Sequence, residues 1–300
     1  MDKVYHGQMK LGLIQRGLTI PTLLQGLAEI SGGLCSGEPG EEITLALAGD
    51  FIVKATLNPP GQDGPKLVCH EDRLRLHMKE GEIEVSIIPI PEFLKRQLKQ
   101  RTPVSENICL DGYCLNIFLR AMGRGKKLSM PVEAILAVIQ SAFEEGSADL
   151  VQLNMDFSDE ADRGFSRLAP LVEAIKKRFN TFVALKGFPP LNHSTIDLMY
   201  ASGFDIIDFP LGGFSGTIKS KRMMTAKKVH SALEYAAGIF PPGTVWTDLV
   251  LGPESHPRSK EGIDRLTDSG IIPLIFLQRD STENPDGFRE LVELADHMDK

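Results

Sequence analysis

Charged and polar side chains interrupt several short apolar segments in the second part of the chain, and these residues could do chemistry. Lys186 ends the segment Phe182–Lys186, and Asp208 and Asp248 lie in two later segments of the same kind. A polar side chain in an apolar segment is costly to bury unless it is paired. We therefore expect Lys186 to pair with Asp208 or Asp248. The whole candidate ligand site is Asn116, Gln152, Asn154, Lys186, Asp208, Asp248 and Arg279.

Two interpretations of this set stay open. In the first, the charged residues form an internal ion-pair network that fills a cavity and binds nothing. In the second, they line a pocket for a small anionic ligand, with Lys186 and Arg279 as its charge partners. Alternation along a strand places Gln152 and Asn154 on one face, and Ala184 with Lys186. In the second interpretation Lys186 and one of the acids would serve acid–base chemistry or anion binding.

The elements that carry these residues alternate between strand and helix after about residue 105. We expect strands at Tyr113–Leu119, Leu150–Asn154, Phe182–Lys186, Phe204–Phe209, Val245–Leu251 and Ile271–Gln278. A helical pattern follows each of them: one from Met130 to near Gly146, then Arg163–Phe179, His193–Ser202, Thr225–Ile239, Ser259–Ser269 and Pro285–His297. Short apolar strands of this kind belong to a parallel sheet covered by helices.

The predicted fold is therefore α/β, a partial (βα)6 TIM-like barrel over residues 105–300. Side chains at the carboxyl ends of the strands face the mouth of such a barrel and carry function. No Gly-x-Gly-x-x-Gly follows the first strand, so nothing directly supports a dinucleotide-binding sheet. Residues 1–104 mix helical segments with strand-like ones, such as the alternating Glu82–Ile88, and predict a small α+β domain.

Several segments together resemble the radical SAM superfamily, in particular biotin synthase and lipoyl synthase. They are Ser129-Met-Pro-Val-Glu-Ala-Ile-Leu, Phe182-Val-Ala-Leu-Lys-Gly-Phe-Pro-Pro, Ile196-Asp-Leu-Met-Tyr-Ala-Ser-Gly-Phe-Asp, Val245-Trp-Thr-Asp-Leu-Val-Leu-Gly-Pro-Glu-Ser and Glu261-Gly-Ile-Asp-Arg-Leu-Thr-Asp-Ser-Gly-Ile-Ile-Pro-Leu. The resemblance implies a radical-SAM-type barrel that binds S-adenosylmethionine and a [4Fe-4S] cluster. Three cysteine thiolates on one loop hold that cluster in the family.

The chain departs from the family at this cluster loop. Residues 121–127 follow the first strand and contain no cysteine, while Cys109 and Cys114 lie before or within the strand. Where a Gly-Gly-Glu-like turn meets S-adenosylmethionine in the family, this chain has Asn154-Met155-Asp156-Phe157. We therefore expect a degenerate barrel, a pseudoenzyme without an iron–sulfur cluster and with no cofactor of its own. Cys109 and Cys114 are weak metal-ligand candidates beside the simpler interpretation of inert thiols.

These departures predict a non-catalytic or ligand-binding subunit that acts with a partner, such as an active radical SAM enzyme, in cofactor or small-molecule biosynthesis. One alternative is a repurposed non-radical enzyme, a lyase, isomerase or transferase, that uses the barrel mouth. Another is an atypical radical SAM enzyme that still uses S-adenosylmethionine and a [4Fe-4S] cluster. Its thiolates would come from a partner chain or from Cys109 and Cys114.

Composition limits the setting in which the protein works. The net charge of -7 argues against general nucleic-acid binding, which favours basic surfaces. The longest apolar runs, such as Ile271–Leu277, are far shorter than the roughly 20 residues that cross a bilayer, so no membrane segment is expected. The four cysteines are irregularly spaced and no secretory signal is visible at the first residues. We expect a cytoplasmic protein.

Overall fold

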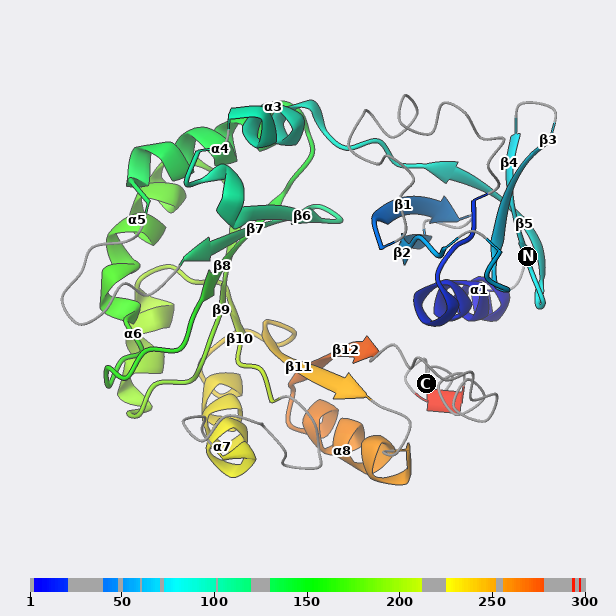
Figure 1. The fold of residues 1–300 in the computed structure, drawn as a ribbon. Coiled ribbons are helices and arrows are strands. Elements are labelled where there is room, and N and C mark those ends of the chain that lie inside the picture. The colour runs from blue at the N-terminus through cyan, green and yellow to red at the C-terminus, as the bar shows by residue number, and fades with distance from the viewer. Residues whose placement is uncertain are drawn as a thin grey trace. The chain divides into compact units, whose positions relative to one another are not determined.

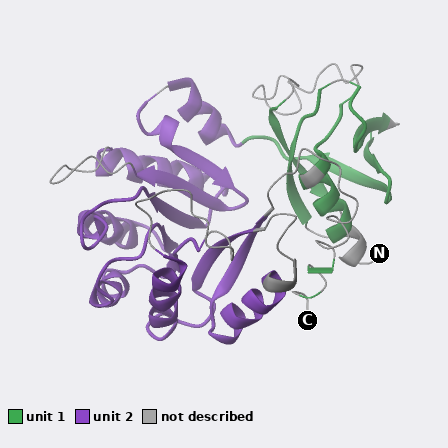
Figure 2. Cartoon of the chain, turned by 60° about the horizontal axis from the view of Figure 1, so that its bottom comes forward, with its two compact units in different colours: residues 1–90, 252–256, 277–300 green, residues 91–251, 257–276 purple. Residues whose placement is uncertain are grey.

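The computed structural model describes residues 3–20, 40–47, 51–59, 61–70, 73–100, 102–119, 130–211, 225–251 and 256–277, with 293, 294 and 297 (Figure 1). The chain divides into two compact units (Figure 2). Unit 1 comprises Met1–Ile90, Gly252–His256 and Leu277–Lys300, and unit 2 comprises Pro91–Leu251 and Pro257–Phe276. Among the described residues, no helix is long and apolar enough to cross a membrane.

The described part of unit 1 contains the helix α1 and one five-stranded sheet. The elements are α1 (Lys3–Arg16), β1 (Glu42–Leu47), β2 (Phe51–Thr56), β3 (Lys66–His70), β4 (Arg73–Met78) and β5 (Gly81–Ile87). The strand order is β2-β1-β5-β4-β3, and the paired strands are antiparallel. Strand β1 alternates buried and open side chains, and its inward Leu45 packs in one core with Leu13 of α1.

Unit 2 is built on a seven-stranded sheet. Its strands are β6 (Ile108–Asp111), β7 (Cys114–Leu119), β8 (Leu150–Met155), β9 (Phe182–Lys186), β10 (Ile206–Asp208), β11 (Val245–Leu251) and β12 (Ile272–Leu277). Its helices are α3 (Glu92–Gln100), α4 (Val132–Glu144), α5 (Ala169–Arg178), α6 (Ser194–Ala201), α7 (Ala226–Ala237) and α8 (His256–Asp268), with 3₁₀ turns η1 (Ser105–Asn107) and η2 (Phe165–Arg167). The strands predicted from the apolar segments are therefore present, while most of the helix expected at Pro285–His297 lies outside the described residues.

The strand order of unit 2 follows the chain, from β6 at one edge to β12 at the other. Strands β7 to β11 are parallel, and β6 is antiparallel to β7. A doubly wound sheet reverses its order at a switch point, which this sheet does not do. Right-handed crossovers without a reversal place all helices on one face, and α4 to α8 do lie on one side of the sheet (Figure 1). The sheet is therefore of the singly wound, barrel-like kind.

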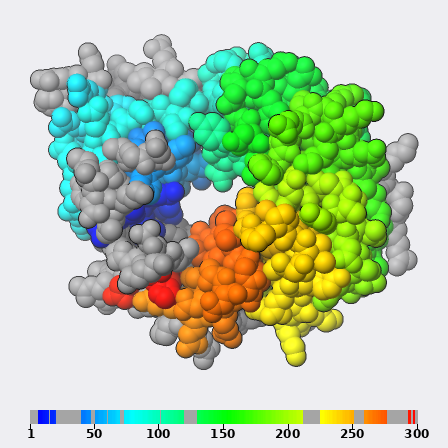
Figure 3. Space-filling model, turned by 180° about the vertical axis from the view of Figure 1, so that it is seen from behind, coloured from blue at the N-terminus to red at the C-terminus, as the bar shows by residue number. Residues whose placement is uncertain are grey.

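A contact across the sheet shows that it curls. Lys186 Nζ of β9 lies 5.2 Å from the centroid of the Phe276 ring of β12, although β10 and β11 separate the two strands. On a flat sheet the two positions would stand roughly 14 Å apart, three strand spacings, with parallel side chains. The face that carries these two residues is therefore concave. In space-filling form the segments of unit 2 follow one another in chain order, from green through yellow to orange (Figure 3).

The main core of unit 2 fills the space between the helices and the outer face of the sheet. Leu115, Ile117 and Leu119 of β7 point into it, as do Val151 and Leu153 of β8, and all are buried. The helices supply Ile135, Ile139, Leu171, Val172, Ile196, Val229 and Leu233. Because side chains alternate along a strand, the residues between these apolar ones face the concave side. The apolar core thus fixes which side chains can form a site.

Three local features differ from the sequence analysis. The edge strand β6 was not predicted, because four residues are too few to show a period. The helix expected at Arg163–Phe179 begins as a turn and becomes α-helical only at Ala169, after Gly164 in a left-handed conformation (φ 83°). Val132 starts α4 after Pro131, two residues later than the Met130 start expected from the sequence.

Candidate functional site

Five of the candidate residues lie in two lateral rows on the concave face of the unit 2 sheet. Strand pairing sets the residues of each row side by side across neighbouring parallel strands. The first row, from β7 to β11, is Phe118, Asn154, Lys186, Asp208 and Trp246. The second, from β7 to β10, is Asn116, Gln152, Ala184 and Ile206. Lys186 and Asp208 are the last residues of their strands, so the first row lies near the carboxyl ends, where parallel-sheet enzymes carry their sites.

Lys186 forms ion pairs with both acids that the sequence analysis considered. Its Nζ lies 2.5 Å from Asp248 Oδ2 and 3.0 Å from Asp208 Oδ2. The Lys186 side chain is 24% exposed and that of Asp248 is 16% exposed, whereas the Asp208 side chain is completely buried. Lys186 and Asp248 are therefore the charged groups that a molecule at this face can reach, and Asp208 lies beneath them.

The carboxylate of Asp208 is not satisfied by hydrogen bonds. Neither of its oxygens has a hydrogen-bond partner among the described residues, nor has Asp248 Oδ1. The 3.0 Å approach of Lys186 Nζ is thus a charge contact whose direction does not suit a hydrogen bond. An ionised carboxylate without hydrogen bonds is costly inside a protein. The buried acid is therefore driven toward its protonated form.

Burial raises the pKa of Asp208 to about 7, the nearby charge of Asp248 adds to this, and Lys186 opposes it. Burial alone would lower the pKa of Lys186, but the two carboxylates outweigh burial and leave that pKa above its usual value. At neutral pH the lysine is accordingly an ammonium, and Asp208 is divided between carboxylic acid and carboxylate. A strongly shifted acid at the carboxyl ends of parallel strands is a physical mark of a functional site.

The three amide side chains form one hydrogen-bonded cluster beside the charged group. Asn116 Oδ1 accepts hydrogen bonds from Gln152 Nε2 at 2.8 Å and from Asn154 Nδ2 at 3.1 Å. Gln152 Nε2 also donates to Asn154 Oδ1 at 3.0 Å, and Asn116 Nδ2 contacts the carbonyl oxygen of Cys114 at 3.3 Å. The cluster uses its N–H groups internally, so it holds three side chains of neighbouring strands in fixed orientations.

Aromatic side chains on the same face were not predicted from the sequence as part of the site. Phe118 is 43% exposed and Phe276 is 48% exposed, and Trp246 follows Asp208 in the first row. Alternation could have placed Phe118 with Asn116 and Trp246 with Asp248, but it could not have shown that the sheet curls enough to bring Phe276 over Lys186. Arg279, the remaining candidate, lies outside the described residues.

The cysteines give no sign of a metal site in the described part of the chain. Burial, and then the charge of Asp111, raise the pKa of the Cys114 thiol to about 12, so it is neutral at pH 7. No cluster of three or more histidine, cysteine, aspartate or glutamate side chains suited to a metal occurs among the described residues. That Cys109 and Cys114 are inert thiols stays a prediction.

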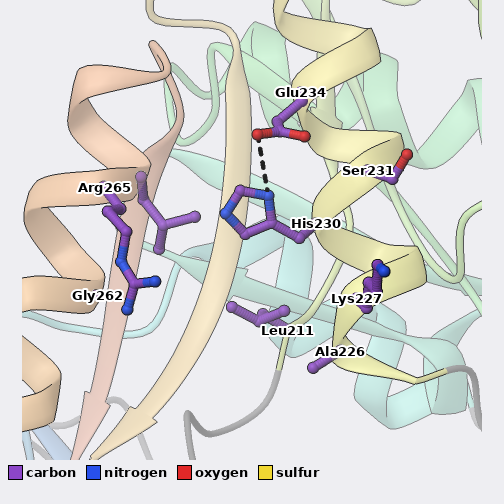
Figure 4. Close-up of a pocket in the computed structure, with 9 residues that line it drawn as sticks. Leu211, Ala226, Lys227, His230, Ser231, Glu234, Gly262 and Arg265 are labelled. Atoms are coloured by element: carbon purple, nitrogen blue, oxygen red, sulfur yellow. Dashed lines mark ion pairs between the residues drawn. The ribbon is translucent and has the colours of Figure 1, made fainter.

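A separate hollow of about 450 Å³ lies between α7 and α8, on the helical side of the sheet (Figure 4). His230 Nδ1 lies 3.4 Å from Glu234 Oε1 beside it, and Arg265 of α8 approaches from the opposite side (Figure 4). The residues around it are Leu211, Ala226, Lys227, His230, Ser231, Glu234, Gly262, Arg265 and Leu266. None of the residues of the two rows lines this hollow, so it is distinct from the candidate site.

Comparisons with known proteins identify no family for this chain. Neither a protein-family model nor a curated protein matches it. Solved structures that match in part include the 7,8-dihydropteroate synthase of Vibrio fischeri (15% identity, TM-score 0.38, 63% of this chain and 69% of that chain). A chitinase domain of Pyrococcus furiosus (12% identity, TM-score 0.41, 71% and 79%) and a Schiff-base-forming fructose-1,6-bisphosphate aldolase (15% identity, TM-score 0.33, 53% and 61%) also match. Likeness at this level assigns no activity.

The resemblance to the radical SAM superfamily is wrong. The solved structures named above are a dihydropteroate synthase, a chitinase domain and an aldolase, and none of the three is a radical SAM enzyme. The segments that carried the resemblance are strand–helix units with glycine stops, a pattern that any singly wound α/β sheet produces. The missing cysteine loop is therefore no sign of degeneration from that family.

Proposed function

We propose that the concave face of unit 2, shaped as a partial (βα)6 barrel, is the active site of an enzyme that transfers protons on a small molecule. The lyase, isomerase and transferase classes fit this chemistry. The observation that carries the proposal is the buried Asp208, which has no hydrogen bond and lies beside the Lys186–Asp248 ion pair. A purely structural network would be expected to satisfy its buried carboxylates.

The two acids differ in environment, and this difference suggests their roles. Asp208 is completely buried and holds a proton near neutral pH, whereas Asp248 is partly open and contacts the Lys186 ammonium at 2.5 Å. Environments that separate two carboxyl groups in this way commonly separate their functions. In the proposal, Asp248 is the catalytic base that touches the substrate, and Asp208 is a positioning residue that keeps the proton of the pair.

The proton transfer balances without a redox cofactor. A substrate C–H, N–H or O–H bond breaks, its proton bonds to the Asp248 carboxylate, and the electron pair stays on the substrate. The Lys186 ammonium, 24% exposed beside Asp248, stabilises the negative charge that develops there. Return of the proton to another substrate atom gives an isomerase, and loss of a leaving group gives a lyase. The amide cluster would orient the substrate from the second row.

Solvent deuterium tests the proposal without knowledge of the substrate. The protein is incubated in D₂O with pooled small-molecule metabolites, and mass spectrometry records compounds that gain deuterium or change. We expect the wild-type protein to label or convert at least one compound and Asp248→Asn to lose at least 100-fold of that rate. Asp208→Asn, which imitates the protonated acid, should label at pH 6 at a rate within about tenfold of the wild-type rate. Its labelling rate should not show the change near pH 7 that we expect of the wild-type protein.

Asp205→Asn is the matched control. Asp205 lies three residues before Asp208, but its carboxylate is fully used: it accepts hydrogen bonds from Lys176 Nζ at 2.7 and 2.9 Å and from Val183 N at 2.7 Å. The folded control variant should retain wild-type labelling. If the wild-type protein labels no compound, or if Asp248→Asn labels as fast as the wild-type protein, the proposal is wrong. Lys186, Asp208 and Asp248 would then form an internal ion-pair network without a catalytic role.

A further inference from the structure

The charges, hydrogen bonds and aromatic rings of the same concave face indicate which class of molecule would bind there. This inference rests on the proposed function for its site. We infer that the face binds a flat, positively charged group with N–H donors, such as an amidinium, a guanidinium or a protonated amino-heterocycle. A small anion, the ligand of one of the two interpretations left open for Lys186 and Arg279, fits the described residues less well. Three independent features of the face support this assignment.

The first feature is charge. One ammonium, on Lys186, faces two carboxyl groups, on Asp208 and Asp248, and it contacts both of them. The positive charge of the described site is thus already neutralised by two carboxyl groups, and Asp248 Oδ1, a buried oxygen of a side chain that is 16% exposed, has no hydrogen bond in the described part of the chain. An incoming anion would meet a neutral or negative site, whereas a cation would complete it.

The second feature is the orientation of the amide cluster. The side-chain N–H groups of Gln152 and Asn154 donate to oxygens within the cluster. Gln152 Nε2 donates to Asn116 Oδ1 and Asn154 Oδ1, and Asn154 Nδ2 donates to Asn116 Oδ1. In the side-chain hydrogen bonds of this cluster Gln152 acts through Nε2, so its Oε1 is left as an acceptor, on a residue that is 8% exposed. A ligand that touches both clusters meets oxygen acceptors, so it must bring the donors itself.

The third feature is the aromatic content of the face. Phe118 and Phe276 expose 43% and 48% of their surface, and Trp246 is the neighbour of Asp208 in the first row. The faces of such rings carry partial negative charge and attract cations. Phe276 already does so, with Lys186 Nζ 5.2 Å from its centroid. Aromatic rings on the face that carries Asp208 and Asp248 favour a flat cation, which can stack and donate hydrogen bonds at once.

Trp246 is the only tryptophan in the sequence and lies beside Asp208, so its fluorescence reports on this site. Benzamidine and benzoate make a matched pair of probes, because the same ring carries a cation in one and an anion in the other. Each is titrated into the full-length protein at pH 8.5 and at pH 6. We expect benzamidine to change the Trp246 emission saturably and to bind at least tenfold more tightly than benzoate at pH 8.5.

Lowering the pH should weaken benzamidine binding several-fold, because Asp208 takes up a proton. The charged groups that face Asp208 are Lys186 on β9 and Asp248 on β11. Asp208→Asn should remove this pH dependence, and Phe276→Ala should weaken binding at both pH values. Asp205→Asn, whose carboxylate belongs to the separate Lys176 pair, should bind benzamidine as the wild-type protein does.

Tighter binding of benzoate than of benzamidine would overturn the inference, and so would the absence of saturable binding of either probe. The deuterium experiment separates this outcome from failure of the proposed function. Labelling of an anionic compound together with benzoate binding would keep the enzyme and refute the ligand class. Benzamidine binding without deuterium labelling of any compound would keep the ligand class and refute proton transfer.

Discussion

Lys186 Nζ lies 3.0 Å from Asp208 Oδ2 without giving that oxygen a hydrogen bond. The ammonium makes its shorter contact, 2.5 Å, with Asp248, which is the more open of the two acids. The Lys186 ammonium thus contacts Asp248 more closely than Asp208, and the buried Asp208 carboxyl group is the one that holds a proton. This inequality distinguishes the group from an ordinary ion pair such as Lys176–Asp205, in which every contact satisfies hydrogen-bond geometry.

The unfolding free energy of Asp208→Asn should depend on pH differently from that of the wild-type protein. The pKa of Asp208 is raised on folding, so below an unfolded value of about 4 the acid is protonated in both states and imposes no penalty. As the pH rises from about 4 through 7, the unfolded state loses its proton first and the wild-type protein loses stability. Above pH 7 we expect the variant to be the more stable by about 1–3 kcal/mol.

Urea unfolding at pH 5, 6, 7 and 8 measures this difference. Asp205→Asn should behave in the opposite sense, because it removes three satisfied hydrogen bonds and must destabilise. If Asp208→Asn destabilises the protein at pH 8 as Asp205→Asn does, then Asp208 is a stabilising ion-pair partner and the interpretation is wrong.

Removal of the Lys186 ammonium should be far more costly than removal of an exposed one. Lys186→Met leaves Asp208 and Asp248 without their cation, so we expect a loss of about 3–5 kcal/mol at pH 8. Lys176→Met, which breaks a pair with Asp205 nearer the surface, should cost about 1 kcal/mol or less. Chemical denaturation of both variants decides this, and equal losses would contradict the special position of Lys186.

The loss in Lys186→Met should be partly recovered by Asp208→Asn in the double variant. The second substitution removes one of the two carboxylates that the missing ammonium leaves together. A double-mutant cycle measures the coupling, which we expect to exceed about 1 kcal/mol. Simple addition of the two single effects would show that Lys186 and Asp208 do not act on each other.

Glu145 should hold the start of α3. Its Oε1 accepts a hydrogen bond from Glu92 N at 2.6 Å, and its Oε2 accepts one from Phe93 N at 2.7 Å. The first amides of a helix have no partner within the helix, and a carboxylate also interacts well with that end. Glu145→Ala should cost about 1–2 kcal/mol and speed hydrogen exchange in α3. Glu144→Ala, beside it, should have little effect on α3 exchange.

The thiols should differ widely in reactivity. Cys69 is exposed, whereas burial, followed by the charge of Asp111, raises the pKa of Cys114 to about 12. Because the thiolate is the reactive form, iodoacetamide at pH 8 should modify Cys69 well before Cys114. Peptide mass spectrometry over time measures both rates. Equal rates would contradict a buried, neutral Cys114, and protection of Cys114 by added iron or zinc would support a metal-ligand role instead.

The sequence was sufficient to predict strands β7 to β12 of unit 2, but it predicted much less of how these strands assemble. The bounds of β9, Phe182–Lys186, follow from one apolar segment that a glycine ends, and the cost of burying an unpaired charge predicted that Lys186 pairs with Asp208 or Asp248, whereas the structure shows it in contact with both. The two rows depend on the stagger of strands far apart in the chain, and the contact of Phe276 with Lys186 depends on curvature. Neither property leaves a local pattern in the residues.

The family assignment failed for a related physical reason. Segments such as Phe182-Val-Ala-Leu-Lys-Gly satisfy the demands of any buried parallel strand that ends in a turn, whatever chemistry lies above it. A family is distinguished by the groups at its site, and the cysteine loop that would have distinguished the radical SAM enzymes was missing from the start. Side chains at the strand ends, and not the strands themselves, were the informative residues.

The pH titration of the Asp208 carboxyl carbon is the most direct test of the account. Carbon-13 NMR of aspartate-labelled protein, with the Asp208→Asn spectrum used to assign the signal, gives the pKa in the folded state. We expect a midpoint near 7, because burial and the charge of Asp248 both favour the protonated acid. A midpoint at or below about 4, the ordinary value for aspartate, would contradict it.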